Sequence, residues 1–226
     1  MVGRLSPAVL SDSLRERIAK HLGAFERRPV GAHAHHAAAV ALAITEEGPG
    51  ADLPGLARPA QWSVRPALIL TRRSLQLRRH AGQWALPGGR TDEGETPEQA
   101  ALRELSEEVQ LHLGPEAILG RLDDYLTRSG YVITPVVVWA GAAREMKPNP
   151  DGVQGIHRIP VDEFMREDAP LLSAGPDPLR PVLRMPVGDH WIAAPTAAAL
   201  YQFREVCIAG RATRVAHFDQ PEFAWR

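Results

Sequence analysis

Apolar runs of strand length alternate with a helix-like segment in this 226-residue chain, and that alternation limits its fold more than any other feature. The runs at 37–44, 66–73 and 131–141 are short, rich in aliphatic residues and followed by turn-forming or polar stretches, as buried strands are. Between the second and third runs, residues 97–109 carry apolar side chains at helical spacing. Interleaved strands and helices predict the α/β or α+β class.

Helices are also predicted near both ends of the chain, over 6–24 and 195–209, because apolar residues recur there every three or four positions. Two other segments are rich in Pro or Gly. Residues 46–65 predict a long loop, and 170–186 predict a linker or covering loop. We therefore expect an N-terminal helical extension at 1–34, a central domain at 35–165, and a C-terminal extension at 166–226 whose helix packs on that domain.

Charge and cysteine content narrow the class of function. The formal net charge is −1, which gives no reason to expect nucleic acid or an anionic membrane as a partner. Cys207 is the only cysteine, so no disulfide can form within the chain and a reducing cytoplasm is the expected location. The first twenty residues lack the apolar stretch of a signal peptide, and the run at 37–44 is too short to span a bilayer. We expect a soluble cytoplasmic protein.

Three glutamates crowd the helix predicted from about Pro97 to Val109. At about 100° per residue, Glu104, Glu107 and Glu108 fall on one face, and the aliphatic side chains fall on another. Like charges at this spacing cost a few tenths of a kcal/mol per pair in an isolated helix. A divalent cation reverses that cost, because hard ions such as Mg²⁺ prefer carboxylate oxygens. The cluster is either a solvated acidic face or a metal site.

The residues around the cluster favour the metal site. Glu95 can hold Arg103 and so fix the loop against the helix, and the glycines of the preceding PGG turn allow close approach to a ligand. From Gly89 the chain runs five residues, Glu95, seven residues, then RELSEEVQL. This resembles the Nudix box, GX5EX7REUXEEXGU, in which U is aliphatic. The residues that match at the required spacing are Gly89, Glu95, Arg103, Glu104, Leu105, Glu107, Glu108 and Leu111.

The resemblance implies a Nudix fold over 35–165, an α/β/α sandwich with a mixed sheet between helices. It also implies a metal-dependent hydrolase of nucleoside diphosphates linked to another group. It implies Mg²⁺ or Mn²⁺ bound by Glu107 and Glu108, with Glu104 as a ligand or as the base that activates water. The Gly88 carbonyl is a further candidate ligand, and Gly89, Glu95 and Arg103 would be structural. Gln110 stands where the box has glycine. Glutamine in a left-handed turn would cost roughly 1 kcal/mol, so we expect the helix to run on there.

A second resemblance lies immediately upstream. Residues 68–89, LILTRRSLQLRRHAGQWALPGG, are similar to the signature of the coenzyme A pyrophosphatase branch, LLTXR(S/A)X3RX3GX3FPGG. Arg73 and Arg78 occupy its two arginine positions and are our candidates for substrate binding, since guanidinium groups bind phosphate oxygens bidentately. Trp84 and Tyr131 are candidates for stacking on a nucleobase, although aromatic residues on strands more often pack in the core.

These patterns predict an enzyme that cleaves coenzyme A, or a derivative of it, to 3′,5′-ADP and 4′-phosphopantetheine. Two alternatives stay open. The substrate could be ADP-ribose, a dinucleoside polyphosphate or a nucleoside triphosphate, because specificity lies in loops outside the box. The chain could also bind a nucleotide without cleaving it, although the intact REXXEE run argues for catalysis. Pairing of two copies is a further expectation from the family.

Overall fold

A computed structural model describes residues 9–31, 36–76 and 80–221. The helices are α1 (Asp12–Ala24), α2 (Pro97–Val109), α3 (Val161–Phe164) and α4 (Thr196–Gln202), with the 3₁₀ turn η1 (Pro115–Ala117) and the π-helical segment η2 (Phe203–Ile208). The strands are β1 (His36–Gly48), β2 (Ser63–Arg73), β3 (Trp84–Ala85), β4 (Gly88–Arg90), β5 (Ile118–Arg121), β6 (Tyr125–Leu126), β7 (Tyr131–Gly141), β8 (Val153–Pro160), β9 (Leu171–Ser173), β10 (Val182–Val187) and β11 (His190–Ala193).

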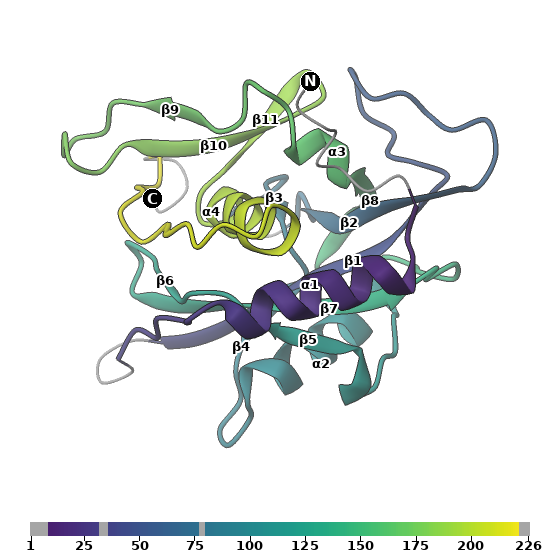
Figure 1. The fold of residues 1–226 in the computed structure, drawn as a ribbon, viewed down its shortest axis with the longest axis horizontal. Coiled ribbons are helices and arrows are strands. Elements are labelled where there is room, and N and C mark those ends of the chain that lie inside the picture. Colours follow the sequence, from purple (N-terminus) through teal and green to yellow (C-terminus); the bar gives the residue numbers. More distant parts are fainter. Residues whose placement is uncertain (1–8, 32–35, 77–79, 222–226) are drawn as a thin grey trace.

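Strand β1 lies at the centre of the main sheet. It pairs in parallel with β7 along most of its length, and on its other side it pairs antiparallel with β2. Strand β8 then joins β2, while β5 and β6 join β7. The parallel pair inside an otherwise antiparallel sheet makes the sheet mixed, as expected for this pattern of strands. Figure 1 shows this sheet between α2 on one side and α1 with α4 on the other.

The segment 84–90 enters the sheet between β1 and β2. Those two strands pair only through residues 44–48 and 63–68. Farther along, β3 pairs with Thr71 and Arg72 of β2, and β4 pairs with residues 38–40 of β1. The Leu86-Pro87 step joins the two pairings, and the Pro87 carbonyl accepts the N–H of Ala41 at 2.8 Å. This one segment therefore brings the PGG turn into the middle of the sheet.

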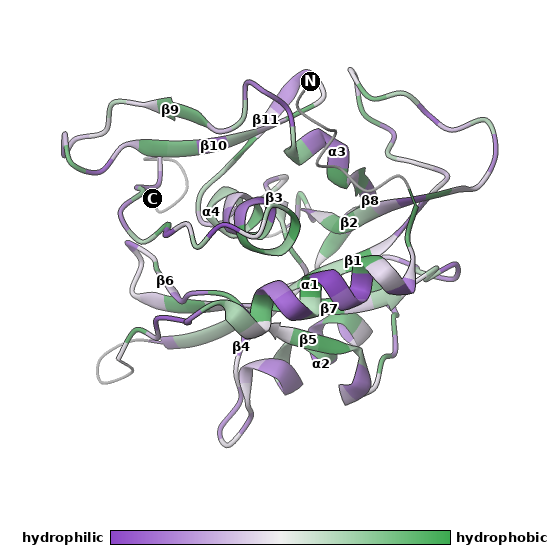
Figure 2. Ribbon diagram, viewed as in Figure 1, coloured by the Kyte–Doolittle hydropathy of each residue, from purple (hydrophilic) through white to green (hydrophobic). Residues whose placement is uncertain are grey.

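The two faces of the sheet carry side chains of different size. Ala39, Ala41 and Ala43 of β1 face α2, where small side chains let the helix approach closely. Leu42 and Ile44 point to the opposite face, in the core shared with α1, α3 and the α4–η2 helix. Figure 2 shows apolar residues concentrated in the central strands and in the α4–η2 helix. The expected α/β class with a mixed sheet between helices is confirmed.

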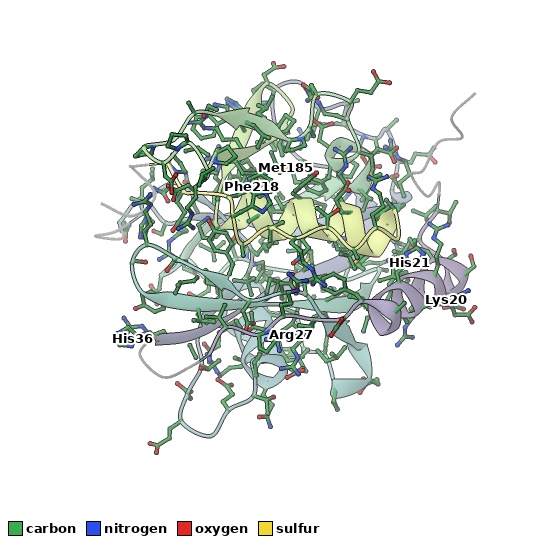
Figure 3. All side chains as sticks on the ribbon, turned by 60° about the vertical axis from the view of Figure 1, so that its left-hand side comes forward. Lys20, His21, Arg27, His36, Met185 and Phe218 are labelled. Atoms are coloured by element: carbon green, nitrogen blue, oxygen red, sulfur yellow. The ribbon has the colours of Figure 1, made fainter. Side chains whose placement is uncertain are left out.

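The C-terminal part covers the second face. Strands β9, β10 and β11 form a separate antiparallel sheet, and α4 lies between it and the main sheet (Figure 1). Helix α4 continues into η2, which packs against α1. Nδ1 of His21 lies 2.9 Å from the Cys207 carbonyl oxygen, and Figure 3 shows His21 beside the end of this last helix. The predicted helix at 195–209 is confirmed.

Three predicted boundaries were wrong. The segment 170–186 contains β9 and most of β10, so it is not a linker. The loop expected at 46–65 is shorter, because β1 extends to Gly48 and β2 begins at Ser63. Within the described residues, α1 begins at Asp12, because the Ser11 side chain caps it by accepting the N–H of Leu14. No helix among the described residues is long and apolar enough to cross a membrane.

Candidate active site

Helix α2 begins where its sequence places a strong start signal. Thr96 is the N-cap, and its side chain accepts the N–H of Gln99 at 3.3 Å. The Gln99 side chain in turn accepts the N–H of Thr96 at 2.9 Å, which completes a capping box, and Pro97 occupies the first turn. With this start, Leu105 and Val109 are buried against the sheet. Glu104 and Glu108 lie on the side of the helix that faces β4, next to Gly89 and Gly88.

Arg103 holds the loop before α2 to the helix itself. Its guanidinium donates to both Glu95 carboxylate oxygens, at 2.9 and 3.0 Å, and to the Arg90 carbonyl at 2.9 Å. One nitrogen, Nη1, also donates to Glu104 at 3.0 Å and to Glu107 at 3.1 Å. The hydrogen bond from Arg103 lowers the pKa of Glu95. The expected contact between Glu95 and Arg103 is present, and Arg103 additionally contacts two of the three cluster glutamates.

Gly88 and Gly89 allow the sheet to approach the glutamates. A Cβ atom on Gly89 would lie 2.1 Å from Oε1 of Glu104, so no other residue fits while Glu104 keeps its position. A Cβ on Gly88 would lie 2.5 Å from the Ala39 carbonyl oxygen. The Gly88 N–H donates to Oε2 of Glu108 at 3.3 Å. This bond is made by the Gly88 N–H, and the Gly88 carbonyl as a metal ligand stays a prediction.

The glutamates differ in their electrostatic environments. Burial raises the pKa of Glu108 to about 7, and the charge of Glu104 adds to the rise, while the Gly88 N–H and Arg73 oppose it. The pKa of Glu104 is also raised, because its burial outweighs the hydrogen bond and charge of Arg103. The Glu107 side chain is 56% exposed, against 12% for Glu104. Two enclosed carboxylates thus lie beside one that is open to solvent.

The structure describes one of the two arginines of the upstream signature, Arg73, but not the other. Arg73, at the end of β2, is close enough to Glu108 to lower its pKa, and its buried Nε has no hydrogen-bond partner among the described residues. It therefore connects the upstream signature to the glutamates. Arg78 lies outside the described residues, so its expected role in substrate binding stays a prediction.

The end of α2 corrects the expectation that the helix runs on through Gln110. The helix ends at Val109, and Gln110 adopts the left-handed conformation with φ of 55°. The N–H of Leu111 then bonds the Leu105 carbonyl at 3.1 Å, which closes the helix end as a glycine usually does. Asn149 also covers this end, because its N–H donates to the Glu108 carbonyl at 2.9 Å. These bonds offset the cost of about 1 kcal/mol for a non-glycine residue in this conformation.

The sequence of the domain matches the model of a known protein family. The family model described as the NUDIX domain matches residues 60–181, which is more than half of the chain. The chain belongs to the Nudix family. The matched segment includes β2, the PGG turn and the whole of α2, so it covers both the upstream signature and the glutamate cluster.

Individual Nudix relatives match over part of the chain. The chain is 42% identical over 99 residues to an uncharacterized Nudix hydrolase, NudL, of Pectobacterium atrosepticum, covering 43% of this chain and 52% of the relative. It is 36% identical over 107 residues to Nudix hydrolase 3 of Caenorhabditis elegans, covering 46% of this chain and 45% of the relative. The chain thus matches about half the length of these curated relatives.

Solved Nudix structures resemble the chain more distantly. A MutT protein from Methanosarcina mazei Go1 superposes with a TM-score of 0.42 at 19% identity, covering 62% of this chain and 83% of that one. The membership of the family rests on the sequence match, and the mixed sheet between helices agrees with it.

The donors around α2 suit a divalent cation. Carboxylate oxygens are the ligands that Mg²⁺ and Mn²⁺ prefer, and Glu108 is an enclosed carboxylate that accepts a hydrogen bond from the Gly88 N–H. In the described part of the chain, no three His, Cys, Asp or Glu side chains converge closely enough to hold a metal ion. Arg103 accounts for this arrangement, since its Nη1 draws Glu104 and Glu107 toward the guanidinium. A cation at this Nudix box would compete with Arg103 for both carboxylates.

Proposed function

We propose that this Nudix protein hydrolyses the diphosphate bond of coenzyme A or a derivative of it. The observation that carries the proposal is that Arg73 lies on the α2 side of the sheet, by strand alternation from Ile69, near enough for its charge to lower the pKa of Glu108. Arg73 belongs to the upstream signature of coenzyme A pyrophosphatases, whereas Glu108 belongs to the box. A guanidinium next to the carboxylate cluster suits a substrate whose diphosphate must lie between positive and negative groups.

In the proposed reaction, a water oxygen forms a bond to one phosphorus atom and the bridging P–O bond breaks. The products are 3′,5′-ADP and 4′-phosphopantetheine, and the water proton passes to a carboxylate, which we assign to Glu104. Mg²⁺ or Mn²⁺ held by Glu104, Glu107 and Glu108, with Gly88 as a further candidate ligand, would neutralise the diphosphate and lower the pKa of the attacking water. Arg73 and Arg78 would bind phosphate oxygens. Gly89, Glu95 and Arg103 would keep the glutamates in position.

The test is product analysis by chromatography. The protein is incubated with coenzyme A, ADP-ribose or diadenosine tetraphosphate, each with Mg²⁺, Mn²⁺ or EDTA. We expect 3′,5′-ADP to form from coenzyme A faster than any product forms from the other two, and only with metal. Faster cleavage of ADP-ribose or the tetraphosphate would show that this compound, rather than coenzyme A, is the substrate of the same hydrolysis. Tight nucleotide binding without turnover under either metal would instead identify a binding module.

Other features of this protein stay predictions. The division at 1–34, 35–165 and 166–226 is one of them, because the family match at 60–181 does not follow those limits. Cytoplasmic location and pairing of two copies are two more. Size-exclusion chromatography with light scattering would test the pairing.

A further inference from the structure

A pocket of about 360 Å³ lies on the opposite side of the main sheet from α2. One wall comes from the ends of β2 and β3, with Arg72, Gln83 and Trp84. The other wall comes from β11 and the start of α4, with Trp191 and Thr196. Figure 1 shows β3 next to α4, where these two parts of the chain meet. We call this the Trp84 pocket, and its volume is within the range of small-molecule sites.

Strand alternation explains why this pocket and the glutamate cluster lie on different faces. Ile69 packs with α2, whereas Leu68 and Leu70 pack in the opposite core. By the same alternation Arg73 lies on the α2 side and Arg72 on the other. Trp84 is the cross-strand partner of Arg72, so the two share a face. The adjacent side chains of Arg72 and Arg73 therefore lie on opposite faces of the sheet.

Arg72 brings a positive charge to the pocket without a matching carboxylate. Its guanidinium lies 4.0 Å from the centre of the Trp84 ring, and its Nη1 donates to the Gly82 carbonyl at 2.8 Å. Burial lowers the pKa of Arg72, and the described residues include no ion pair for it. Asp189 also lines the pocket, but its carboxylate lies against Gly55 and its N–H donates to the Pro54 carbonyl at 3.1 Å. A partly buried guanidinium with remaining donors suits an anionic group.

Two tryptophan rings, Trp84 and Trp191, give the pocket aromatic surface. The Trp84 ring meets His157 edge-on at 4.9 Å, and its buried Nε1 has no hydrogen-bond partner among the described residues. On the facing wall, Trp191 is 43% exposed and carries Arg184 at 4.7 Å from its ring centre. Indole rings stack on planar bases, and a buried indole N–H favours a ligand acceptor. Together with Arg72, these groups match a planar base that carries phosphate.

We propose that the Trp84 pocket binds the phosphorylated nucleoside end of the diphosphate substrate, with the base against Trp84 and Trp191 and a phosphate at Arg72. This inference rests on the proposed function. The pantetheine arm is flexible and uncharged, so it would use neither the guanidinium nor the indole rings. Trp84 precedes Gly88 by four residues, so their Cα atoms are at most about 14 Å apart, roughly the length of a nucleotide. The segment 84–90 thus joins the pocket to the glutamates.

The test measures binding of 3′,5′-ADP by isothermal titration calorimetry in EDTA, so that turnover and metal play no part. We expect the wild-type protein to bind it and Arg72→Gln to bind at least tenfold more weakly. Arg144→Gln is the matched control, because Arg144 also stacks on a tryptophan, Trp62, at 4.5 Å, away from this pocket. It should bind within twofold of wild type. Arg72→Lys, which keeps the charge and loses the planar fork, should fall between the two.

Several outcomes would overturn the inference. They are absence of 3′,5′-ADP binding to the wild type, equal binding by Arg72→Gln, or an equal loss in Arg144→Gln. If 4′-phosphopantetheine bound more tightly than 3′,5′-ADP and its binding depended on Arg72, the pocket would hold the pantetheine end of the substrate instead. Circular dichroism checks that the variants fold, and Arg72→Lys decides the question if Arg72→Gln does not. Arg72-dependent binding without coenzyme A cleavage would contradict the proposed function alone, whereas cleavage with unchanged binding in Arg72→Gln would contradict this inference alone.

Discussion

Asp219 is a buried carboxylate and Glu108 a half-buried one, and the two differ in how the chain balances their charge. Asp219 is 1% exposed and accepts both ends of the Arg128 guanidinium, with Nε at 2.7 Å from Oδ1. The hydrogen bond from Arg128 lowers the pKa of Asp219. Glu108 accepts one backbone N–H at 3.3 Å, and burial raises its pKa to about 7. One acid has a matched cation, and the other does not.

The difference follows from how the arginines are distributed. Arg128 forms a two-pronged ion pair with Asp219, and the pair fastens the segment around Asp219 to the turn between β6 and β7. Around α2, by contrast, Arg103 is shared among Glu95, Glu104 and Glu107. Carboxylates in excess over cations are unfavourable for folding unless another cation binds. A buried acid is therefore informative about function when its own chain does not neutralise it.

The largest effect should come from Glu108→Gln. We expect its turnover to fall by about 10²–10⁴-fold, because a metal-binding carboxylate is lost. Its thermal stability should be unchanged or higher, because glutamine removes an enclosed charge that has no dedicated cation. Turnover is measured with the best substrate of the panel, and stability by thermal unfolding.

Glu98→Gln is the matched control for that experiment. Glu98 lies on the same helix but pairs with Arg121 at 3.0 Å, away from the cluster. It should keep turnover within about twofold. Full metal-dependent turnover in Glu108→Gln would show that the box is not the catalytic centre.

Asp219→Asn should do the reverse of Glu108→Gln. We expect a loss of about 2–3 kcal/mol in the free energy of unfolding, because Arg128 loses its charged partner, and turnover close to wild type. The pKa of Asp219 is lowered from its ordinary value of 3.8, so this stabilisation is present above that pH and is lost as pH falls through the folded-state pKa. Denaturant unfolding at pH 7 and at progressively lower pH measures it. A stability difference that persisted unchanged in strong acid would contradict the ion-pair explanation.

Gly89→Ala should have an intermediate effect on turnover. Its Cβ would lie 2.1 Å from Glu104, and the flexible carboxylate can move away at small cost to folding. We expect about a tenfold loss of turnover and a stability change within about 1 kcal/mol. Gly152→Ala is the control, because nothing lies within 4 Å of a Cβ there. Equal turnover in the two variants would mean that the position of Glu104 does not matter.

The smallest effect is stabilisation by metal. At a Mn²⁺ concentration ten times the dissociation constant, the wild-type protein should gain about 1.4 kcal/mol, or roughly 3–6 °C in Tm over the EDTA sample. Asp219→Asn should gain the same increment from its lower starting Tm. Glu108→Gln should gain less. Differential scanning calorimetry distinguishes these cases. If Glu108→Gln gained as much in Tm from Mn²⁺ as the wild type, the metal site would lie elsewhere.

Much of α2 could be predicted from the sequence because its information is local. Pro97 and the three-to-four-residue spacing of the glutamates define its start and its faces without reference to other elements. The conformation of Gln110 could not be predicted in the same way. It depends on the Schellman-type bond from Leu111 and on cover from Asn149, and the second of these is tertiary.

Other features depend on contacts between distant parts of the chain. Strand β10 includes Pro186, a residue that argues against a strand, and only its pairing with β9 and β11 makes the segment 182–187 extended. The Trp84 pocket likewise needs Thr196 beside Arg72, although the two are far apart in sequence. Strand alternation alone could have indicated that Arg72 and Arg73 point to opposite faces.

The contact between α1 and η2 has a consequence for how the chain folds during its synthesis. Ile18 and Leu22 lie in one core with Val206 and Cys207, so α1 can pack against η2 only after η2 has been synthesised. Until then its apolar face has no cover from η2, and closing so long a loop slows folding. A chain truncated before Phe203 should therefore be bound by chaperones and degraded by proteases, even though it contains the whole glutamate cluster.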